Sequence, residues 1–211
     1  MSKRYFLSDT HFGHSNIVKY CNRPWLRNGD LDELGNWTSE KTALDCAERM
    51  NAGLIKSINM RVKEEDQVIC VGDFINYGSA KGVKGLKLKS QEYLKQLNGT
   101  WSLIRGNHDA NNHAKFIAKY MIIDIGPYQA FVCHHPTDNP IHSPSLIDWV
   151  YRCCDFAIVG HVHQAWKTNW VKTKNFNFLN INVSVEVQKY VPIDDSEIIG
   201  IYEKCKRTLG K

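Results

Sequence analysis

The sequence predicts an α/β fold, in which short buried strands alternate with helices. Five apolar runs of about four residues have the length and composition of strands buried on both faces. Stretches whose apolar residues recur at helical spacing lie between several of these runs. Each of the five runs also ends abruptly in polar side chains. In sheets of this class, ligands bind beyond the carboxyl ends of the strands.

The expected strands follow one another along the chain, and a polar cluster comes directly after each. They are Tyr5–Leu7 before Ser8, Val68–Val71 before Gly72, Ser102–Ile104 before Arg105, Ala130–Cys133 before His134, and Phe156–Val159 before Gly160. A further strand is expected over residues 176–187, where polar and apolar side chains alternate. That alternation is typical of a strand with only one face buried.

Helices are expected between and after these strands. The longest covers residues 38–60, because Thr38-Ser39-Glu40 has the composition of a helix start and apolar residues follow at helical spacing. Shorter helices are expected over residues 87–97, 111–119 and 194–206. Residues 20–35 and 78–89 have the composition of loops, and the second of these is rich in glycine and lysine.

The length and composition of the chain indicate one soluble globular domain, which we expect to span residues 1–211. Hydrophobic residues make up 43% of the chain and charged residues 23%. The formal net charge is +5, from 27 Lys and Arg against 22 Asp and Glu. A mildly basic balance suits a phosphorylated or nucleic-acid substrate, and it is equally typical of an ordinary solvated surface.

The sequence indicates neither export nor membrane insertion. The apolar stretch after Lys3-Arg4 stops at Ser8, which is too short for a signal peptide. No apolar run approaches the roughly 18–20 residues of a membrane span. The seven cysteines are odd in number and include no C-x-x-C pair. We therefore expect reduced thiols, a cytoplasmic protein and no membrane partner.

The polar residues that follow the strands form a set of metal ligands. They are two carboxylates, one amide and four imidazoles: Asp9, His11, Asp73, Asn107, His134, His161 and His163. A set without thiolates differs from the cage of a structural zinc, and it suits divalent Mn, Fe, Co, Ni or Zn. Seven ligands exceed what one catalytic ion with an open position can use. They fit two divalent ions that share a bridging carboxylate.

Two divalent ions in this set would carry more charge than their ligands neutralise. The ions bring four positive charges, Asp9 and Asp73 return two negative charges, and the neutral side chains return none. Such a site attracts a phosphate anion. Two ions about 3.5–4 Å apart can generate hydroxide at neutral pH and stabilise both the attacking and the leaving oxygen.

The order and spacing of these residues resemble the motif series of the calcineurin-like metallophosphoesterases. The matching segments are Asp9-x-His11, Gly72-Asp73, Gly106-Asn107-His108-Asp109, His134 and Gly160-His161-x-His163. The stretches DTHFGHSNI, CNRPW and INVSVEVQKYVPIDDSEI further resemble a branch of small, single-domain bacterial and phage members. The resemblance implies a four-layer α/β/β/α sandwich of two mixed sheets flanked by helices.

The resemblance implies a role for each matching ligand. It assigns Asp9, His11 and His163 to one metal, Asn107, His134 and His161 to the other, and Asp73 to a bridge between the two. Manganese is the metal that we favour, with iron, nickel, cobalt and zinc as alternatives. From the sequence alone we expect His161 and His163 in an extended segment, on alternate sides of the backbone.

Five further residues are expected to act on the substrate. By resemblance, His108 is a general acid or electrostatic stabiliser over the phosphate, and Asp109 orients its ring. Arg105 matches an arginine that grips phosphate oxygens bidentately in related phosphatases. His14 and Arg23 lie in the loop after the first ligand pair, so we expect them to contact the substrate.

These residues predict a metal-dependent phosphoric ester hydrolase, in which a metal-bridging hydroxide attacks phosphorus. Within that class we favour a phosphodiesterase that acts on small nucleotide-type substrates, with a phosphomonoesterase as the alternative. A nuclease acting on DNA or RNA is a second alternative, although the net charge is modest for it. A non-catalytic scaffold of the same fold is a third, and the complete ligand set argues against it.

Overall fold

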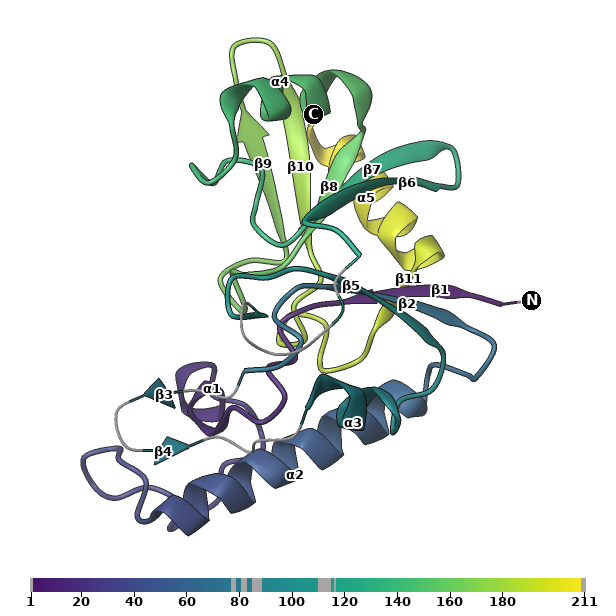
Figure 1. The fold of residues 1–211 in the computed structure, drawn as a ribbon. Helices are drawn as coiled ribbons and strands as arrows, with labels where there is room; N and C mark the ends of the chain where they lie inside the picture. Colours follow the sequence, from purple (N-terminus) through teal and green to yellow (C-terminus); the bar gives the residue numbers. More distant parts are fainter. Residues whose placement is uncertain are drawn as a thin grey trace.

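The computed structural model describes residues 2–76, 79–80, 83–84, 89–109, 115 and 117–209. Two mixed sheets pack face to face between helices, with α2 at one end of the molecule and α4 at the other (Figure 1). The first sheet contains, in spatial order, β11 (Ile193–Asp194), β1 (Arg4–Leu7), β2 (Gln67–Val71) and β5 (Thr100–Ile104). The second contains β6 (Tyr120–Ile125), β7 (Tyr128–Cys133), β8 (Phe156–Val159), β10 (Asn177–Asn182) and β9 (Thr168–Lys172). The four-layer architecture expected from the sequence is confirmed.

The remaining elements are helices and one short strand pair. The helices are α1 (Ser15–Tyr20), α2 (Glu40–Asn59), α3 (Ser90–Leu94), α4 (Pro144–Cys153) and α5 (Asp195–Leu209). The strand pair joins β3 (Ser79–Ala80) to β4 (Val83–Lys84). None of the helices in the described ranges has both the length and the apolar character that a membrane span requires.

Helix α2 covers the outer face of the first sheet. It begins where the sequence predicts, because the Ser39 hydroxyl accepts a hydrogen bond from the backbone N–H of Thr42 at 3.0 Å. Its buried stripe includes Met50 and Leu54, which pack in one cluster with Leu7 and other outward-facing residues of the sheet. Helical spacing of the apolar residues therefore gives α2 one buried face.

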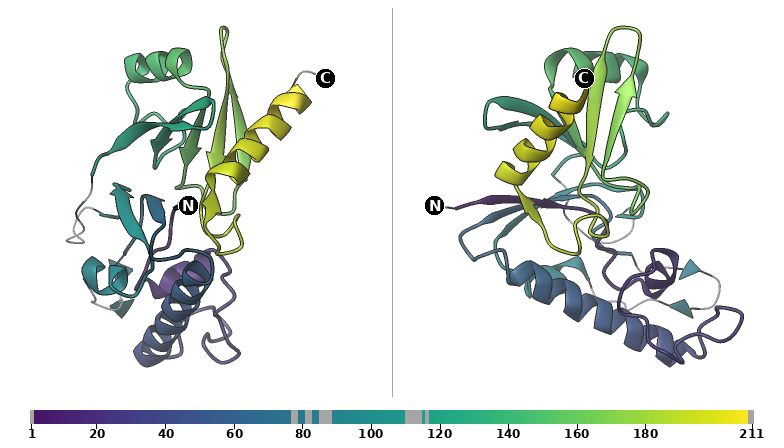
Figure 2. Two further views of the ribbon diagram at one scale, coloured as in Figure 1. Left: turned by 90° about the vertical axis from the view of Figure 1, so that its right-hand side faces the viewer. Right: turned by 180° about the vertical axis from the view of Figure 1, so that it is seen from behind.

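The layer between the sheets is an apolar core that both sheets share. Phe6 and Val71 of the first sheet belong to the same cluster as Val132 and Ile158 of the second. Alternate residues of β1 and β2 enter this layer, because successive side chains of a strand point to opposite faces. Figure 2 shows α5 beside the second sheet, and Tyr202 of this helix joins the same core.

Helix α4 covers the outer face of the second sheet. Val150 packs there against Phe131 and Val159. The helix is capped by Ser143, whose hydroxyl accepts a hydrogen bond from the N–H of Leu146 at 3.3 Å. The sequence patterns did not predict α4, α1 or the edge strands β6 and β9.

The five expected strand ends meet in one region. Strands β1, β2 and β5 are parallel to one another, and β7 is parallel to β8. The two sheets are joined there, because Ser8 donates to the Val183 carbonyl at 3.0 Å and accepts from Val185 at 3.1 Å. All five polar clusters therefore belong to a single site.

Two expectations about local structure differ from what is observed. The alternating strand is not half-buried, because five of the six residues of β10 are buried. Its polar side chains Asn180 and Asn182 are 0% exposed. The helix expected over 111–119 does not include its described end, where Ala118 pairs with Ile104 as a β-bridge. Residues 110–114 and 116 lie outside the described ranges, as does most of the loop expected over 78–89.

Candidate metal centre

The loops that follow β1 and β2 run side by side and bring the first ligands together. The N–H of Asp9 donates to the Gly72 carbonyl at 3.1 Å, and the N–H of His11 donates to the Asp73 carbonyl at 3.0 Å. These bonds continue the pairing of the two strands beyond their ends. They place the carboxylates of Asp9 and Asp73 in adjacent positions, one from each loop.

Five of the seven candidate ligand residues adopt a left-handed backbone conformation. The φ angles are +57° at Asp9, +49° at His11, +51° at Asp73, +71° at His161 and +45° at His163. Residues other than glycine seldom adopt such angles, and backbone strain of this kind gathers at functional sites. His161 and His163 therefore lie in a turn rather than in the extended segment that we expected.

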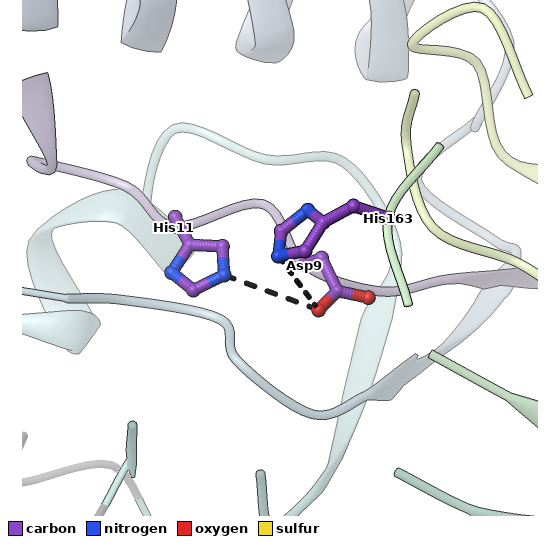
Figure 3. A group of neighbouring side chains, drawn as sticks. All are labelled: Asp9, His11 and His163. Atoms are coloured by element: carbon purple, nitrogen blue, oxygen red, sulfur yellow. Dashed lines mark ion pairs between the residues drawn. The ribbon is translucent and has the colours of Figure 1, made fainter. Parts of the chain in front are cut away.

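Asp9 lies at the centre of the first ligand group. Its Oδ1 atom is 3.9 Å from His11 Nε2 and 3.8 Å from His163 Nε2, and both rings point toward this oxygen (Figure 3). The second oxygen, Oδ2, accepts hydrogen bonds from Ser8 Oγ at 2.5 Å and Ser184 Oγ at 2.8 Å. The two serines therefore hold the carboxylate so that Oδ1 faces the imidazoles.

Asp73 connects the first ligand group to the second. Its Oδ2 atom is 3.6 Å from His11 Nε2 and 3.3 Å from His134 Nε2. In the second group, Asn107 Oδ1 lies 2.9 Å from His134 Nε2 and 3.0 Å from His161 Nδ1. One carboxylate oxygen therefore faces ligands of both groups, which is the geometry of a bridging ligand.

The donor set fits two divalent cations. Ligand atoms that each lie about 2.0–2.2 Å from one metal are roughly 3.0–3.5 Å apart, close to the spacing in the second group. In the first group the spacing is slightly wider. Both ring nitrogens of His11 are buried and have no hydrogen-bond partner within the described part of the chain. Buried polar atoms are almost always paired, so these two nitrogens indicate an expected ligand.

The charges of the second group favour a cation. Burial opposes protonation of His134, yet Asp73 and Asp9 outweigh it and raise the pKa of His134 to about 9. Burial also opposes ionisation of Asp73, but His134 and His11 hold the pKa of this carboxyl well below its usual range. Burial lowers the pKa of His161 and of His11 in the first group, which favours the neutral imidazole that a metal binds.

Glu186 contacts a candidate ligand and was not predicted from the sequence. Its Oε1 atom lies 3.0 Å from His163 Nδ1 and also accepts from both Nε and Nη2 of Arg23. Burial opposes ionisation of Glu186, but His163 and Arg23 lower its pKa to about 2. Glu186 is a lone acid between two valines, which was the available signal in the sequence. It fixes the ring of His163, as carboxylates do for metal-binding histidines.

His163 also has a thiol nearby. One ligand atom each from Cys21, His163 and Glu186 lies within 4.8 Å of the others. Burial lowers the pKa of His163, but Cys21, Glu186 and Asp9 outweigh it and raise this pKa to about 10. Glu186 already forms an ion pair with Arg23. We therefore interpret the group of Cys21, His163 and Glu186 as a support for the His163 ring and not as a further metal site.

Arg23 is placed differently from the expectation that it contacts substrate, and the same expectation for His14 stays a prediction. Arg23 is 1% exposed, and its guanidinium donates to the carbonyls of Asp9 and Thr10 as well as to Glu186. This geometry makes Arg23 a support beneath the ligand loop. His14 is 9% exposed, its ring lies 5.8 Å from that of His11, and burial lowers its pKa to about 4.

Asp109 holds the backbone of the ligand loops. Its Oδ2 atom accepts from the N–H groups of Asp73 and Gly106, both at 2.8 Å. These hydrogen bonds give Asp109 a role in holding the backbone, and orientation of the His108 ring by Asp109 stays a prediction. Gly106 is required at this point, because a Cβ there would lie 2.8 Å from Asp73 Cγ and closer still to its backbone nitrogen.

His108 and Arg105 border the ligand groups. The ring of His108 lies edge-on to that of His11, with 5.5 Å between the ring centroids. The His108 N–H donates to Asp73 Oδ1 at 2.9 Å, so the residue is tied to the bridging carboxylate. Arg105 is exposed and lines a cavity of about 290 Å³, whose walls also include Asn107 and His134. An open cavity therefore adjoins the second ligand group.

Comparison with known proteins identifies the family. The model of the calcineurin-like phosphoesterase superfamily domain matches residues 5–182. An uncharacterized protein from Methanocaldococcus jannaschii is 34% identical over 207 residues, which cover 98% of this chain and 94% of that protein. Among solved structures, a protein of unknown function from Aquifex aeolicus is 25% identical with a TM-score of 0.60. That match covers 95% of this chain and all of the other.

A more distant structural match is a phosphoesterase from E. coli. It is 16% identical with a TM-score of 0.40, and the match covers 85% of this chain and 78% of that one. At this level the likeness adds nothing to the assignment of the site, which depends on the residues described above.

Proposed function

The chain belongs to the calcineurin-like phosphoesterase superfamily, and we propose that it is a metal-dependent phosphodiesterase acting on small nucleotide-type substrates. One observation carries the proposal. Asp73 Oδ2 lies 3.6 Å from a nitrogen of His11 and 3.3 Å from a nitrogen of His134, so two groups of ligands converge on one oxygen. The superfamily generally uses a dinuclear metal centre, and its substrates are phosphate esters.

The residues that would hold the two cations are those of the two ligand groups. The proposed first set is Asp9, His11 and His163, the second is Asn107, His134 and His161, and Asp73 would belong to both. When bound there, divalent cations, for which we propose manganese, would supply Lewis acidity and positive charge toward a phosphate. Glu186, Ser8 and Ser184 would keep the ligand atoms in position before a cation arrives.

His108 and Arg105 would act on the substrate itself. His108 is exposed and lies beside His11, so it would donate a proton to the oxygen of the departing group. Arg105 lines the adjoining cavity, where its guanidinium would donate to the oxygens of the phosphate. We also propose a cytoplasmic location, which the seven free cysteines support.

The proposal is tested with manganese-loaded protein and two chromogenic esters. Bis-p-nitrophenyl phosphate is a diester and p-nitrophenyl phosphate is a monoester with the same leaving group. We expect turnover of the diester, loss of that turnover in Asp73→Asn, and a fall of about 10²–10⁴-fold in kcat in His108→Ala. Asp148→Asn is the matched control, because Asp148 is an exposed aspartate in a surface ion pair.

The outcomes separate the possible functions. Turnover of the monoester alone would make the protein a phosphomonoesterase. Full activity in Asp73→Asn would rule out a role of the bridging carboxylate in catalysis. Failure to retain any metal after dialysis against manganese would overturn the proposal itself.

A further inference from the structure

The cavity beside the second ligand group has the composition of a recognition pocket. It lies among the loop after β5, the start of β6, the end of β7 and the start of α4. Its volume of about 290 Å³ lies just below the range of about 300–1,000 Å³ for ligand pockets. The volume suits one small molecule and is too small for an extended polymer. Asn107 and His134 belong both to its wall and to the second ligand group.

The charge of the cavity favours an anionic ligand. Arg105 and Lys119 are exposed cations in its wall. No aspartate or glutamate occurs among its lining residues in the described ranges, and no described carboxylate forms an ion pair with either cation. An uncompensated pair of cations beside two ligands of a metal site would attract a phosphate.

The remaining walls favour a flat apolar group attached to that phosphate. Ile141 and Tyr120 keep 64% and 44% of their surface exposed and both line the cavity, so they offer apolar surface that a ligand would cover. Tyr120 and His142 are ring-bearing residues of the wall. Both contact Phe131, with 5.4 Å and 6.4 Å between the ring centroids. Aromatic side chains favour a planar ligand, because every nucleobase has a flat π face that can stack on them.

We infer that this cavity binds the nucleobase side of a mononucleotide ester whose phosphate lies at the metal centre. Tyr120 and Ile141 contact the base, and Arg105 and Lys119 balance the charge of the phosphate. The inference rests on the proposed function, because the metal centre is what places the phosphate. It deepens that function by assigning specificity to residues outside the motifs of the superfamily.

The test compares the binding of adenosine 5′-monophosphate with that of ribose 5-phosphate to the manganese-loaded protein by calorimetry. The two probes share the ribose ring and the phosphate, and ribose 5-phosphate carries a hydroxyl where the nucleotide carries its base. We expect the nucleotide to bind about tenfold more tightly. Tyr120→Ala removes this advantage and leaves the affinity for ribose 5-phosphate within twofold. Ile141→Ala, at an exposed loop position, reduces the advantage without risk to the fold.

The control is Trp149→Ala, because Trp149 is an exposed aromatic residue of α4 that does not line the cavity. It should keep the full advantage of the base. Equal affinity for the two probes would overturn the inference, as would an advantage that persists in both Tyr120→Ala and Ile141→Ala. Octyl phosphate that competes as well as the nucleotide would show an alkyl pocket and would also overturn it.

Binding and turnover fail independently in this design. Preferential binding of the nucleotide without hydrolysis of bis-p-nitrophenyl phosphate would support the cavity assignment and refute the proposed function. Hydrolysis of bis-p-nitrophenyl phosphate with no preference for the base would do the reverse.

Discussion

Replacement of Glu186 by glutamine tests whether a buried charge pair supports the ligand loops. The side chains of Arg23 and Glu186 are 0% and 4% exposed, and Glu186 Oε1 lies 2.6 Å from Arg23 Nη2. The same oxygen lies 3.0 Å from His163 Nδ1. Glutamine has nearly the shape of glutamate, so the change removes the charge and leaves the packing almost intact.

The expected loss of stability is large, because Arg23 remains buried with only neutral partners. Removal of one member of a buried pair typically costs about 3–5 kcal/mol. For a chain of 211 residues, where 1 kcal/mol shifts the Tm by about 2–4 °C, the Tm falls by about 6–20 °C. Metal affinity falls as well, by about 10–100-fold, since His163 loses the carboxylate that orients it.

Urea unfolding in the presence of EDTA measures the first effect, and metal content after dialysis measures the second. Asp148→Asn breaks an exposed pair and is expected to cost less than about 0.5 kcal/mol. The double variant Arg23→Met/Glu186→Gln should be less destabilised than the sum of the single variants, by about 1–3 kcal/mol. A loss below about 1 kcal/mol for Glu186→Gln, or strict additivity in the double variant, would refute the reasoning.

Three further changes test other parts of the structure. Asp194 caps α5 and pairs with Lys3, and although burial opposes its ionisation, these partners lower its pKa to about 2 from 3.8. Asp194→Asn should therefore cost about 2 kcal/mol in urea unfolding at pH 6, and the difference from the unchanged protein should shrink as the pH falls from about 4 toward 2. Gly106→Ala forces the Asp73 carboxylate to move, so metal affinity should fall about 10–100-fold while circular dichroism is unchanged; normal metal content would contradict this. Leu54→Ala removes a side chain that is 0% exposed, and urea unfolding should show a loss of about 2–5 kcal/mol.

The parts of the fold that the sequence predicts are the strands buried on both faces and the helix with a clear start and a regular apolar stripe. Strands such as β2 and β8 are continuous apolar runs, and α2 carries both a capping serine and an apolar stripe. The strands β6 and β9 were not predicted from the sequence, because they are the edge strands of the second sheet. Their side chains are mostly half-buried, so hydrogen bonds to a neighbouring strand, rather than apolar composition, hold them in place.

In the candidate site, too, residues marked by local sequence patterns were predicted, and residues that depend on contacts distant in sequence were not. The structure brings together all seven residues proposed as ligands, because each follows a strand whose end the sequence marks. The role of Glu186 as a support could not be predicted, since its partner Arg23 is 163 positions away in the chain. Ser184 was not predicted for a related reason. Its polar position in an alternating strand indicates exposure, yet it is 0% exposed and donates a hydrogen bond to Asp9.

The left-handed backbone at five of the proposed ligand residues would make metal binding there a trade-off against the stability of the metal-free chain. Each such angle at a residue other than glycine costs on the order of 1–3 kcal/mol, and five ligands carry one. Glycine at His161 or His163 would relax the metal-free chain while it removed a ligand. If the proposed cations bind there, a substitution that relaxes the metal-free chain at these positions would also weaken metal binding, and the free energy of metal binding would offset the backbone strain.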